Sequence, residues 1–383
     1  MKIGVPKERR AYEARVAASP ETVKKLIALG AEVVVEAGAG QGARLADSLF
    51  TDAGATIAND PAEVFGADLV LKVQRPLAAG DGDVDEMALL KSGTMLVGAL
   101  DPYRNKEQVK AYADHGLIAF ALELLPRTTR AQAMDILSSQ ANLSGYKAVI
   151  DGLSHYSKVM PMMMTAAGTV APAKVFVMGA GVAGLQAIAT AKRLGAVVSA
   201  TDVRPASKEE VESLGARFVG FVPEDAATEG GYARALTDEE RAKQAEMVAE
   251  HIKGQDLVIT TAAIPGRPAP RLVDSAMVKS MKPGSVIVDL AVESGGNVEG
   301  TQPAKVVDVN GVTLVGYVNT PSRLAPATSL LFAKNLLNFT NLLVDKESKS
   351  LKVNHEDDLI KGTLLTENGQ IVHAAFQETA STN

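Results

Sequence analysis

The chain has 383 residues, enough for two domains of ordinary size, each with its own core. Hydrophobic residues make up 46% and charged residues 22%, as in globular proteins, and the formal net charge of −6 argues against nucleic acid as the main partner. The sequence contains no cysteine, which excludes disulfides, thiolate metal sites and thiol nucleophiles.

The first 125 residues alternate short apolar runs with helical stretches, which predicts a parallel α/β sheet. Buried strands are expected over residues 2–5, 32–36, 69–73, 94–98 and 117–122. Ser19, followed by proline, is a good helix N-cap, and Gly30 would end that helix. A glycine cluster after the second strand lacks both a third glycine at helix-packing distance and a distal acid, so a plain turn is expected at Gly38, Gly40 and Gly42.

Residues 127–160 interrupt this alternation with a long, mostly helical segment, which we interpret as an interdomain connector. Gln132, Asp135 and Ser139 fall at helical spacing, so they could present one polar face to a cleft. A solvated helix face would explain the same pattern. Four methionines at the end of the segment are expected to fill gaps in the core: Met160, Met162, Met163 and Met164.

A dinucleotide-binding fingerprint begins at the apolar run 175–178. Gly179 would make the turn out of this strand, Gly181 would let a pyrophosphate approach the backbone, and Gly184 would let the following helix pack on the sheet. A second apolar strand over 196–201 ends at Asp202, where a carboxylate can accept the ribose hydroxyls of NAD. The sequence therefore predicts a nucleotide site on the N-terminus of a helix.

Later strands are expected over 217–219, 257–260, 285–289 and 312–316, followed by an apolar helix over 329–343. Two long connectors suggest that the C-terminus returns to the first domain. The expected fold is α/β, with two Rossmann-like domains that have parallel sheets and a cleft between them. The first domain would contain 1–138 and 320–383, and the second, inserted in the first, would contain 139–319.

Residues 221–243 form a polar stretch with a Gly230-Gly231 hinge before Tyr232, which suits either a functional lid or a disordered loop. None of the five histidines has a neighbourhood that suggests an oriented base. Lys72, inside an apolar strand, is a better candidate for a functional cation. Asp289 and Glu293 are conceivable catalytic carboxylates and equally ordinary residues of a βα loop.

Together these segments resemble the NAD(H)-binding domain I, or α subunit, of proton-translocating nicotinamide nucleotide transhydrogenase. The stretches that carry the resemblance are 127–151, 161–204, 230–233 and 282–296. Alanine dehydrogenase is similar in fold and shares the opening KIGVPKE, an arginine matching Arg15 and a lysine matching Lys72. Its catalytic histidine would fall at 97–99, where none is present, and Glu293 stands where that family has a catalytic aspartate. Hydride exchange between two nicotinamide rings needs no such base.

The resemblance implies a site for NAD(H) and no metal. At the nicotinamide end it implies Arg127, Gln132, Asp135 and Ser138, with Gln132 positioning the dihydronicotinamide ring. For the remainder of the cofactor it implies three groups of residues. These are the fingerprint glycines with Val182 and Ala183 at the pyrophosphate, Asp202, Val203 and Arg204 at the adenosine, and Gly231, Tyr232, Gln244 and Ala263 around the pocket. A larger aliphatic residue is expected in the family at Ala263.

The resemblance also implies partners, namely a polypeptide that holds NADP(H), a membrane-spanning subunit and a second copy in a homodimer. No secretory signal or transmembrane span is evident, so we expect a soluble, cytoplasmic chain that is peripheral on the inner membrane through its partners. Two alternatives stay open, an amino-acid oxidoreductase similar to alanine dehydrogenase and an NAD-sensing module without turnover.

Overall fold

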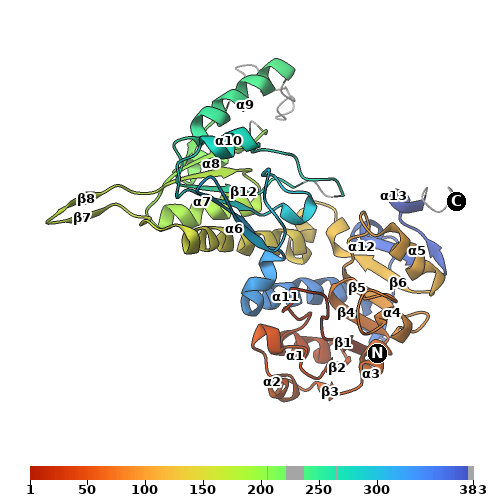
Figure 1. The fold of residues 1–383 in the computed structure, drawn as a ribbon. Helices are drawn as coiled ribbons and strands as arrows, with labels where there is room; N and C mark the ends of the chain where they lie inside the picture. Colours follow the sequence, from red (N-terminus) through yellow and green to blue (C-terminus); the bar gives the residue numbers. More distant parts are fainter. Residues whose placement is uncertain (205, 221–236, 264–265, 378–383) are drawn as a thin grey trace. The chain divides into compact units, whose positions relative to one another are not determined.

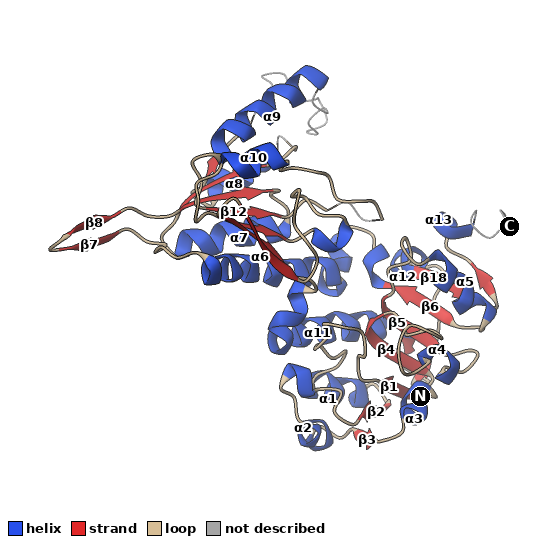
Figure 2. Ribbon diagram, in the orientation of Figure 1, coloured by secondary structure: helices blue, strands red, loops and turns tan. Residues whose placement is uncertain are grey.

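The computed structural model describes residues 1–204, 206–220, 237–263 and 266–377 and divides into two compact units. The first contains Met1–Gln140 and Pro321–Asn383, and the second contains Ala141–Thr320. These limits differ by one or two residues from the boundaries expected from the sequence. Each unit is a mostly parallel sheet with helices on its faces (Figure 1 and Figure 2), which confirms the α/β class.

The sheet of the first unit has the strand order β19-β18-β6-β5-β4-β1-β2-β3. Its strands are β1 (Lys2–Val5), β2 (Glu32–Glu36), β3 (Thr56–Ala58), β4 (Leu69–Gln74), β5 (Met95–Ala99), β6 (Ile118–Ala121), β18 (Leu364–Glu367) and β19 (Gln370–Ile371). Strand β18 pairs antiparallel with β6, so the C-terminal segment completes the sheet that the N-terminus begins. The order changes direction between β1 and β4, which is where open α/β sheets bind ligands.

Helices cover both faces of this first sheet. They are α1 (Pro20–Ala28), α2 (Asp47–Asp52), α3 (Pro61–Phe65), α4 (Glu86–Leu89), α5 (Lys106–Asp114), α11 (Ala325–Leu343), α12 (Asp358–Thr363) and α13 (Ala374–Gln377), with 3-10 turns η1 (Gln41–Ala43), η2 (Leu122–Leu124), η3 (Thr129–Met134) and η5 (Thr320–Leu324). Ser19 caps α1 as expected and forms a reciprocal capping box with Thr22. Helix α11 buries Phe332, Leu336 and Phe339 against one face, and so it holds the C-terminal segment in place.

The second sheet has the order β11-β10-β9-β12-β13-β15-β14. Its strands are β9 (Lys174–Met178), β10 (Val197–Thr201), β11 (Arg217–Phe218), β12 (Leu257–Thr260), β13 (Val286–Asp289), β14 (Lys305–Val309) and β15 (Val312–Gly316). Alternate residues of β9 enter different cores, with Val175 and Val177 on one face and Phe176 and Met178 on the other. The first face is covered by α6 (Ile136–His155), α7 (Val182–Arg193) and α8 (Ser207–Ser213), and the second by α9 (Asp238–Ile252) and α10 (Ser275–Ser280).

The structure corrects two expectations. The connector is mostly helical, as expected, but Gln132, Asp135 and Ser139 do not share one helix, because η3 ends before Asp135 and α6 starts after it. Three of the four methionines are not core residues, since Met162, Met163 and Met164 are 60%, 46% and 79% exposed and only Met160 is buried. They lie at the start of a hairpin, β7 (Met163–Thr165) and β8 (Gly168–Val170), that extends away from the sheet of its unit (Figure 1). A second small hairpin joins β16 (Val344–Asp345) to β17 (Ser350–Leu351).

Several strand ends differ from the sequence expectation by one residue, and the helix expected over 329–343 begins at Ala325. Four strands of the two main sheets were not expected, namely β3, β14, β18 and β19. None of the helices within the described residues combines the length and apolarity needed to cross a bilayer.

Glu123, in η2 directly after β6, has a buried carboxyl group. Its Oε1 accepts a hydrogen bond from the backbone N–H of Asp101, whereas its Oε2 is buried without a hydrogen-bond partner in the described residues. Burial raises the pKa of Glu123 to about 7, and hydrogen bonds from backbone N–H groups only partly oppose this shift. The folded state therefore favours the protonated carboxyl.

Because the folded pKa of Glu123 lies above the unfolded value, its contribution to stability is present below pH 4.5 and is lost as the pH rises to 7. We predict that Glu123→Gln, which cannot ionise, unfolds at higher urea concentration than the wild type at pH 8, by about 1–3 kcal/mol. The difference should vanish near pH 5. Glu107→Gln, on the exposed face of α5, is the control. A Glu123→Gln variant with the same pH profile as the wild type would contradict the assignment.

Candidate functional site

The glycine fingerprint lies between β9 and α7 in the second unit. Gly179 has a φ of +105°, and its carbonyl accepts a hydrogen bond from the Thr261 hydroxyl at 3.0 Å. A Cβ on Gly184 would lie 1.8 Å from the Gly179 carbonyl oxygen, so only glycine allows the helix to approach the strand this closely. A Cβ on Gly181, in contrast, would have no atom within 4 Å. Gly181 therefore faces open space at the start of the helix.

The N-terminus of α7 has no side-chain cap. Gly181 is its N-cap residue, and among the described residues no side-chain oxygen caps the first N–H groups of the helix. Val182 is exposed and Ala183 is half-buried, so the backbone at this end is accessible. Uncapped N–H groups at the positive end of a helix favour an anion such as a phosphate. The cradle therefore fits a pyrophosphate.

Asp202 follows β10 and lies beside the fingerprint turn. Its Oδ2 accepts from the Ala180 N–H at 2.7 Å, and its Oδ1 accepts from the backbone N–H and Nε of Arg204 at 2.8 and 3.0 Å. Burial would raise the pKa of the Asp202 carboxyl, but the hydrogen bonds from Arg204 and Ala180 outweigh burial and lower it. Asp202 is thus a stable carboxylate. Val203 beside it is 71% exposed, and Gln244 donates to the Asp202 carbonyl at 3.3 Å.

A second loop, after β12, borders the fingerprint turn. Asn297 is fully buried and pairs with the backbone of Ala262 in both directions, accepting from its N–H at 3.1 Å and donating to its carbonyl at 2.8 Å. The adjacent Thr261 holds Gly179, and the adjacent Ala263 is exposed. Thr261 and Asn297 were not expected from the sequence, because their partners are backbone atoms more than thirty residues away.

The remaining residues implied by the resemblance belong to the first unit or lie outside the described residues. Gly231 and Tyr232 are in the latter group. Arg127 and Gln132 are both exposed. Asp135 caps α6, because its two carboxylate oxygens accept from the N–H and hydroxyl of Ser138 at 2.9 and 2.5 Å. The helical face expected from Gln132, Asp135 and Ser139 is therefore interrupted at Asp135.

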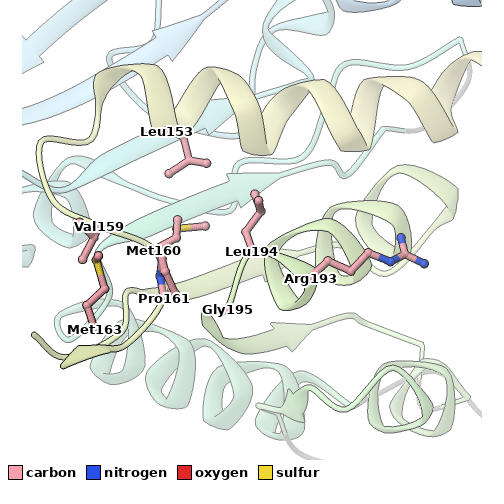
Figure 3. Close-up of a pocket in the computed structure, with 8 residues that line it drawn as sticks. All are labelled: Leu153, Val159, Met160, Pro161, Met163, Arg193, Leu194 and Gly195. Atoms are coloured by element: carbon pink, nitrogen blue, oxygen red, sulfur yellow. The ribbon is translucent and has the colours of Figure 1, made fainter.

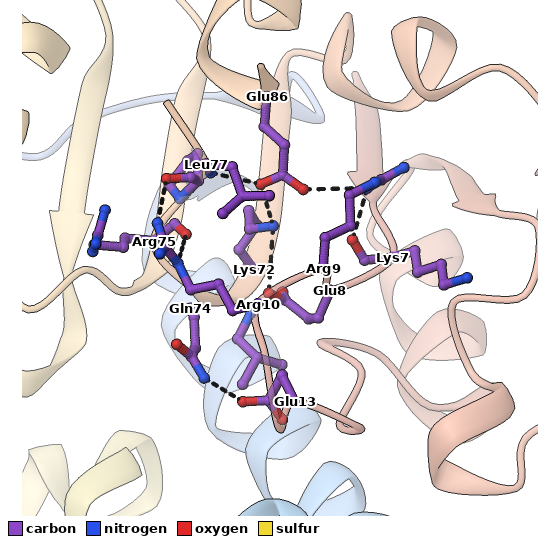
Figure 4. Close-up of polar contacts among 12 residues, drawn as sticks. Lys7, Glu8, Arg9, Arg10, Glu13, Lys72, Gln74, Arg75, Leu77 and Glu86 are labelled. Atoms are coloured by element: carbon purple, nitrogen blue, oxygen red, sulfur yellow. Dashed lines mark hydrogen bonds and ion pairs between the residues drawn. The ribbon is translucent and has the colours of Figure 1, made fainter. Parts of the chain in front are cut away.

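The glycine turn of the second unit follows its central strand, β9. In the first unit, charged side chains fill the space near the ends of the central strands β1 and β4 (Figure 4). Lys72 is 1% exposed, and its Nζ lies 2.8 Å from Glu86 and 3.4 Å from Glu8. Burial above all raises the pKa of Glu8 to about 6, which the charge of Lys72 partly offsets. Arg9 pairs with both Glu86 and Glu36. The cation expected to be functional is thus enclosed by carboxylates.

Arg15 is buried in the same unit, with Nε and NH2 on Glu13 and NH1 on Gln140. The histidines have structural partners, which are Leu90 for His115, Tyr317 for His155, Ser199 for His251, Glu367 for His355 and Gly362 for His373. Within the described ranges no cluster of potential metal ligands is present. Asp289 accepts from the N–H groups of Ala291 and Val298 and so closes the loop that carries the exposed Glu293.

An apolar pocket of the second unit lies elsewhere (Figure 3). It is formed by Leu153, Val159, Met160, Pro161, Met163, Arg193, Leu194 and Gly195. The last three residues are at the C-terminal end of α7, whose twelve residues span about 18 Å. The pocket is therefore separated from the fingerprint by the length of that helix.

Replacing Gly184 or Gly181 by alanine should have different effects on stability and on nucleotide binding. Gly184→Ala should destabilise the protein by about 1–3 kcal/mol, because the added methyl group overlaps the Gly179 carbonyl. Gly181→Ala should fold like the wild type but lose affinity for NADH, because its methyl group would occupy the approach of the pyrophosphate. Thermal unfolding and fluorescence titration separate the two effects. Wild-type NADH affinity in Gly181→Ala would place the nucleotide elsewhere.

Comparison with known proteins agrees with this geometry. Models described as alanine dehydrogenase/PNT, N-terminal domain and C-terminal domain, match residues 4–144 and 148–374. The first part of NAD(P) transhydrogenase subunit alpha from Rhodospirillum rubrum is 56% identical over 98% of this chain and 99% of its own. The Rickettsia prowazekii protein of the same name is 47% identical over 99% of this chain and 98% of its own.

Solved structures give the same result. Transhydrogenase from Sinorhizobium meliloti superposes with a TM-score of 0.89 at 54% identity, covering 97% of this chain and 100% of that one. An L-alanine dehydrogenase superposes with a TM-score of 0.82 at 28% identity, covering 99% of both chains. The chain therefore belongs to the alanine dehydrogenase/PNT family of oxidoreductases.

Proposed function

We propose that the chain is the NAD(H)-binding component of a proton-translocating transhydrogenase. It passes hydride from NADH to NADP+ held on a partner subunit, and a membrane-spanning subunit couples this exchange to proton movement. The identity to transhydrogenase alpha subunits over nearly the whole chain supports the proposal. On this proposal the chain works at the cytoplasmic face of the membrane through its partners, as a homodimer.

One observation carries the proposal, the difference between two sheets with related strand order. In both units a central strand (β1 or β9) has two parallel strands on one side and three parallel strands on the other, and the edge beyond those three is antiparallel. Of these two central strands, only β9 is followed directly by a glycine turn and an uncapped helix N-terminus, whereas Pro6, Lys7 and Glu8 follow β1. The first unit has Lys72, Glu86 and Glu8 there. A chain with one dinucleotide cradle needs a second polypeptide to hold the hydride acceptor.

The same cluster argues against amino-acid oxidation. The residues that match the substrate anchors of alanine dehydrogenase are Arg15 and Lys72, and both are buried and paired with carboxylates of this chain. No histidine is present in β5, and Glu293 accepts a hydrogen bond from the Asn319 N–H at 2.8 Å. A substrate carboxylate would have to displace buried ion pairs, which is costly.

The residues of the second unit bind the nucleotide in this proposal. The N–H groups of Val182 and Ala183 bind the pyrophosphate, and Asp202 accepts hydrogen bonds from the adenosine ribose. Arg204, 58% exposed along its side chain, shares the Asp202 carboxylate, so the ribose hydroxyls replace part of its contact. Bound NADH supplies the hydride at its nicotinamide ring.

The residues of the first unit orient the reacting end. Gln132 has an exposed side-chain amide that suits a carboxamide or a ring edge. Asp135 acts indirectly, because it holds Ser138 and the start of α6. Hydride transfer between two rings requires position and exclusion of water rather than a general base, so the partner has to complete the site.

We predict that the chain binds NADH more tightly than NADPH by about 2–3 kcal/mol, because the Asp202 carboxylate would face a 2′-phosphate of like charge. Asp202→Asn should remove most of this preference, whereas Glu212→Gln, an exposed carboxylate near the end of α8, should not. Fluorescence titration with both reduced nucleotides measures the two affinities. Comparable affinities in the wild type would refute the role of Asp202.

We predict that Gln132→Asn lowers the rate of hydride transfer by about 100-fold while NADH affinity changes little, since a shorter amide displaces the ring by about 1 Å. Stopped-flow mixing of the chain, an NADP(H)-binding partner, NADH and thio-NADP+ measures the rate. Gln370→Asn, exposed in β19, is the matched control. A full-rate Gln132→Asn variant, or turnover without a partner, would refute the proposed function. Binding of NADH without exchange in the presence of the partner would favour a sensing module.

A further inference from the structure

The segment that carries Gln132 is anchored on one side by apolar packing. Ala131, Met134 and Ile136 are buried in the same core cluster as Phe332 and Leu336 of α11. Gln132 lies between two of these anchors and is itself exposed. The packing of η3 against α11 therefore determines which way this part of the backbone faces.

Two asparagines of α11 add a polar clamp at the next residue. The side-chain amides of Asn335 and Asn338 both donate to the carbonyl oxygen of Ala133, each at 2.9 Å. They are three residues apart, so they are neighbours on the helix surface. A carbonyl oxygen has two lone pairs, and the two amides use both. Ser139 donates to Oδ1 of Asn335 at 2.7 Å and so fixes its orientation.

The fold of η3 does not require two side-chain donors on the Ala133 carbonyl. Ala133 is exposed, so water could satisfy its carbonyl without any side chain. Two donors from one rigid helix instead fix both the position and the direction of this peptide group. The clamped peptide group joins Ala133 to Met134, one residue beyond Gln132, so it restricts the backbone next to the residue from which the Gln132 side chain extends.

We propose that Asn335 and Asn338 are positioning residues for Gln132. They hold the Ala133 carbonyl against α11 and thereby set where the Gln132 amide lies during hydride transfer. This inference rests on the proposed function, because it assumes that Gln132 orients the nicotinamide ring. Neither asparagine touches the nucleotide in this scheme, so they act on the rate of transfer rather than on binding.

The test uses Asn338, which is half-buried and leaves the Asn335–Ser139 contact intact when replaced. Asn338→Ala removes the donor, and Asn338→Asp keeps the shape but presents a carboxylate that cannot donate to a carbonyl. Asn341→Ala is the matched control, since its amide donates at 2.8 Å to Leu337 within the same helix. A role in helix packing alone would affect the control and Asn338→Ala alike.

The first measurement is hydrogen–deuterium exchange of residues 131–135 in the chain alone. We expect faster exchange in Asn338→Ala and Asn338→Asp, and wild-type exchange in Asn341→Ala. Unchanged exchange in both Asn338 variants would overturn the clamp without reference to activity.

The second measurement is the rate of hydride transfer to thio-NADP+ on the NADP(H)-binding partner, with NADH affinity measured alongside. We expect Asn338→Ala to slow transfer about tenfold, through a displacement of less than about 1 Å, and to change NADH affinity less than about twofold. Asn338→Asp should be slower still, and Asn341→Ala should match the wild type. If Gln132→Asn is slow and Asn338→Ala is not, the inference is wrong and the proposed function stands. If Gln132→Asn keeps its full rate, the proposed function itself fails.

Discussion

The ion pair between Lys72 and Glu86 fills the position of the first unit at which open α/β sheets bind ligands. It lies near the point where the strand order of the sheet changes direction, and Glu8 and Arg9 extend it into a buried network. Removing one partner of such a pair leaves an uncompensated buried charge and costs about 3–5 kcal/mol. The network is therefore a fixed part of the core. With this position filled, the glycine turn of the second unit is the place in the described residues that remains open to a nucleotide phosphate.

The second unit depends on contacts between backbone atoms. Gly184 and Gly179 approach so closely that no side chain fits between them, and Thr261 and Asn297 fix the neighbouring loop through its main chain. Side chains that hold main-chain atoms recur in the first unit, where Asn335 and Asn338 hold Ala133. In both units, therefore, side-chain amides hold the main chain of a segment that also carries an exposed residue, Gln132 in one and Ala263 in the other.

The sequence was sufficient for features that depend on local patterns. Apolar runs located most strands to within a residue, and the fingerprint located Gly179, Gly184 and Asp202 where the structure has them. Among the hairpins that were missed, β14–β15 and β18–β19 each have an Asn-Gly turn with positive φ at both residues, Asn310-Gly311 and Asn368-Gly369. The side-chain contacts to the backbone of Ala133 and Ala262 could not be predicted from the sequence. Every residue has a backbone carbonyl, so no residue type marks the one that accepts the hydrogen bond. Asp135 three residues before Ser138 is a local pattern that could have predicted the N-cap of α6. It was missed because Asp135 was assigned to a helical face together with Gln132 and Ser139.

The start of the hairpin β7–β8 carries methionine side chains that are exposed to solvent. The protein has no cysteine, so its methionines are its only sulfur atoms, and those at 162, 163 and 164 are largely open to solvent while Met178 is 2% exposed. An oxidant converts an accessible thioether into a polar sulfoxide, which methionine sulfoxide reductases reverse. Oxidative damage to this protein would therefore begin on the hairpin, changing its surface from apolar to polar while the sheet that carries the glycine turn keeps its packing.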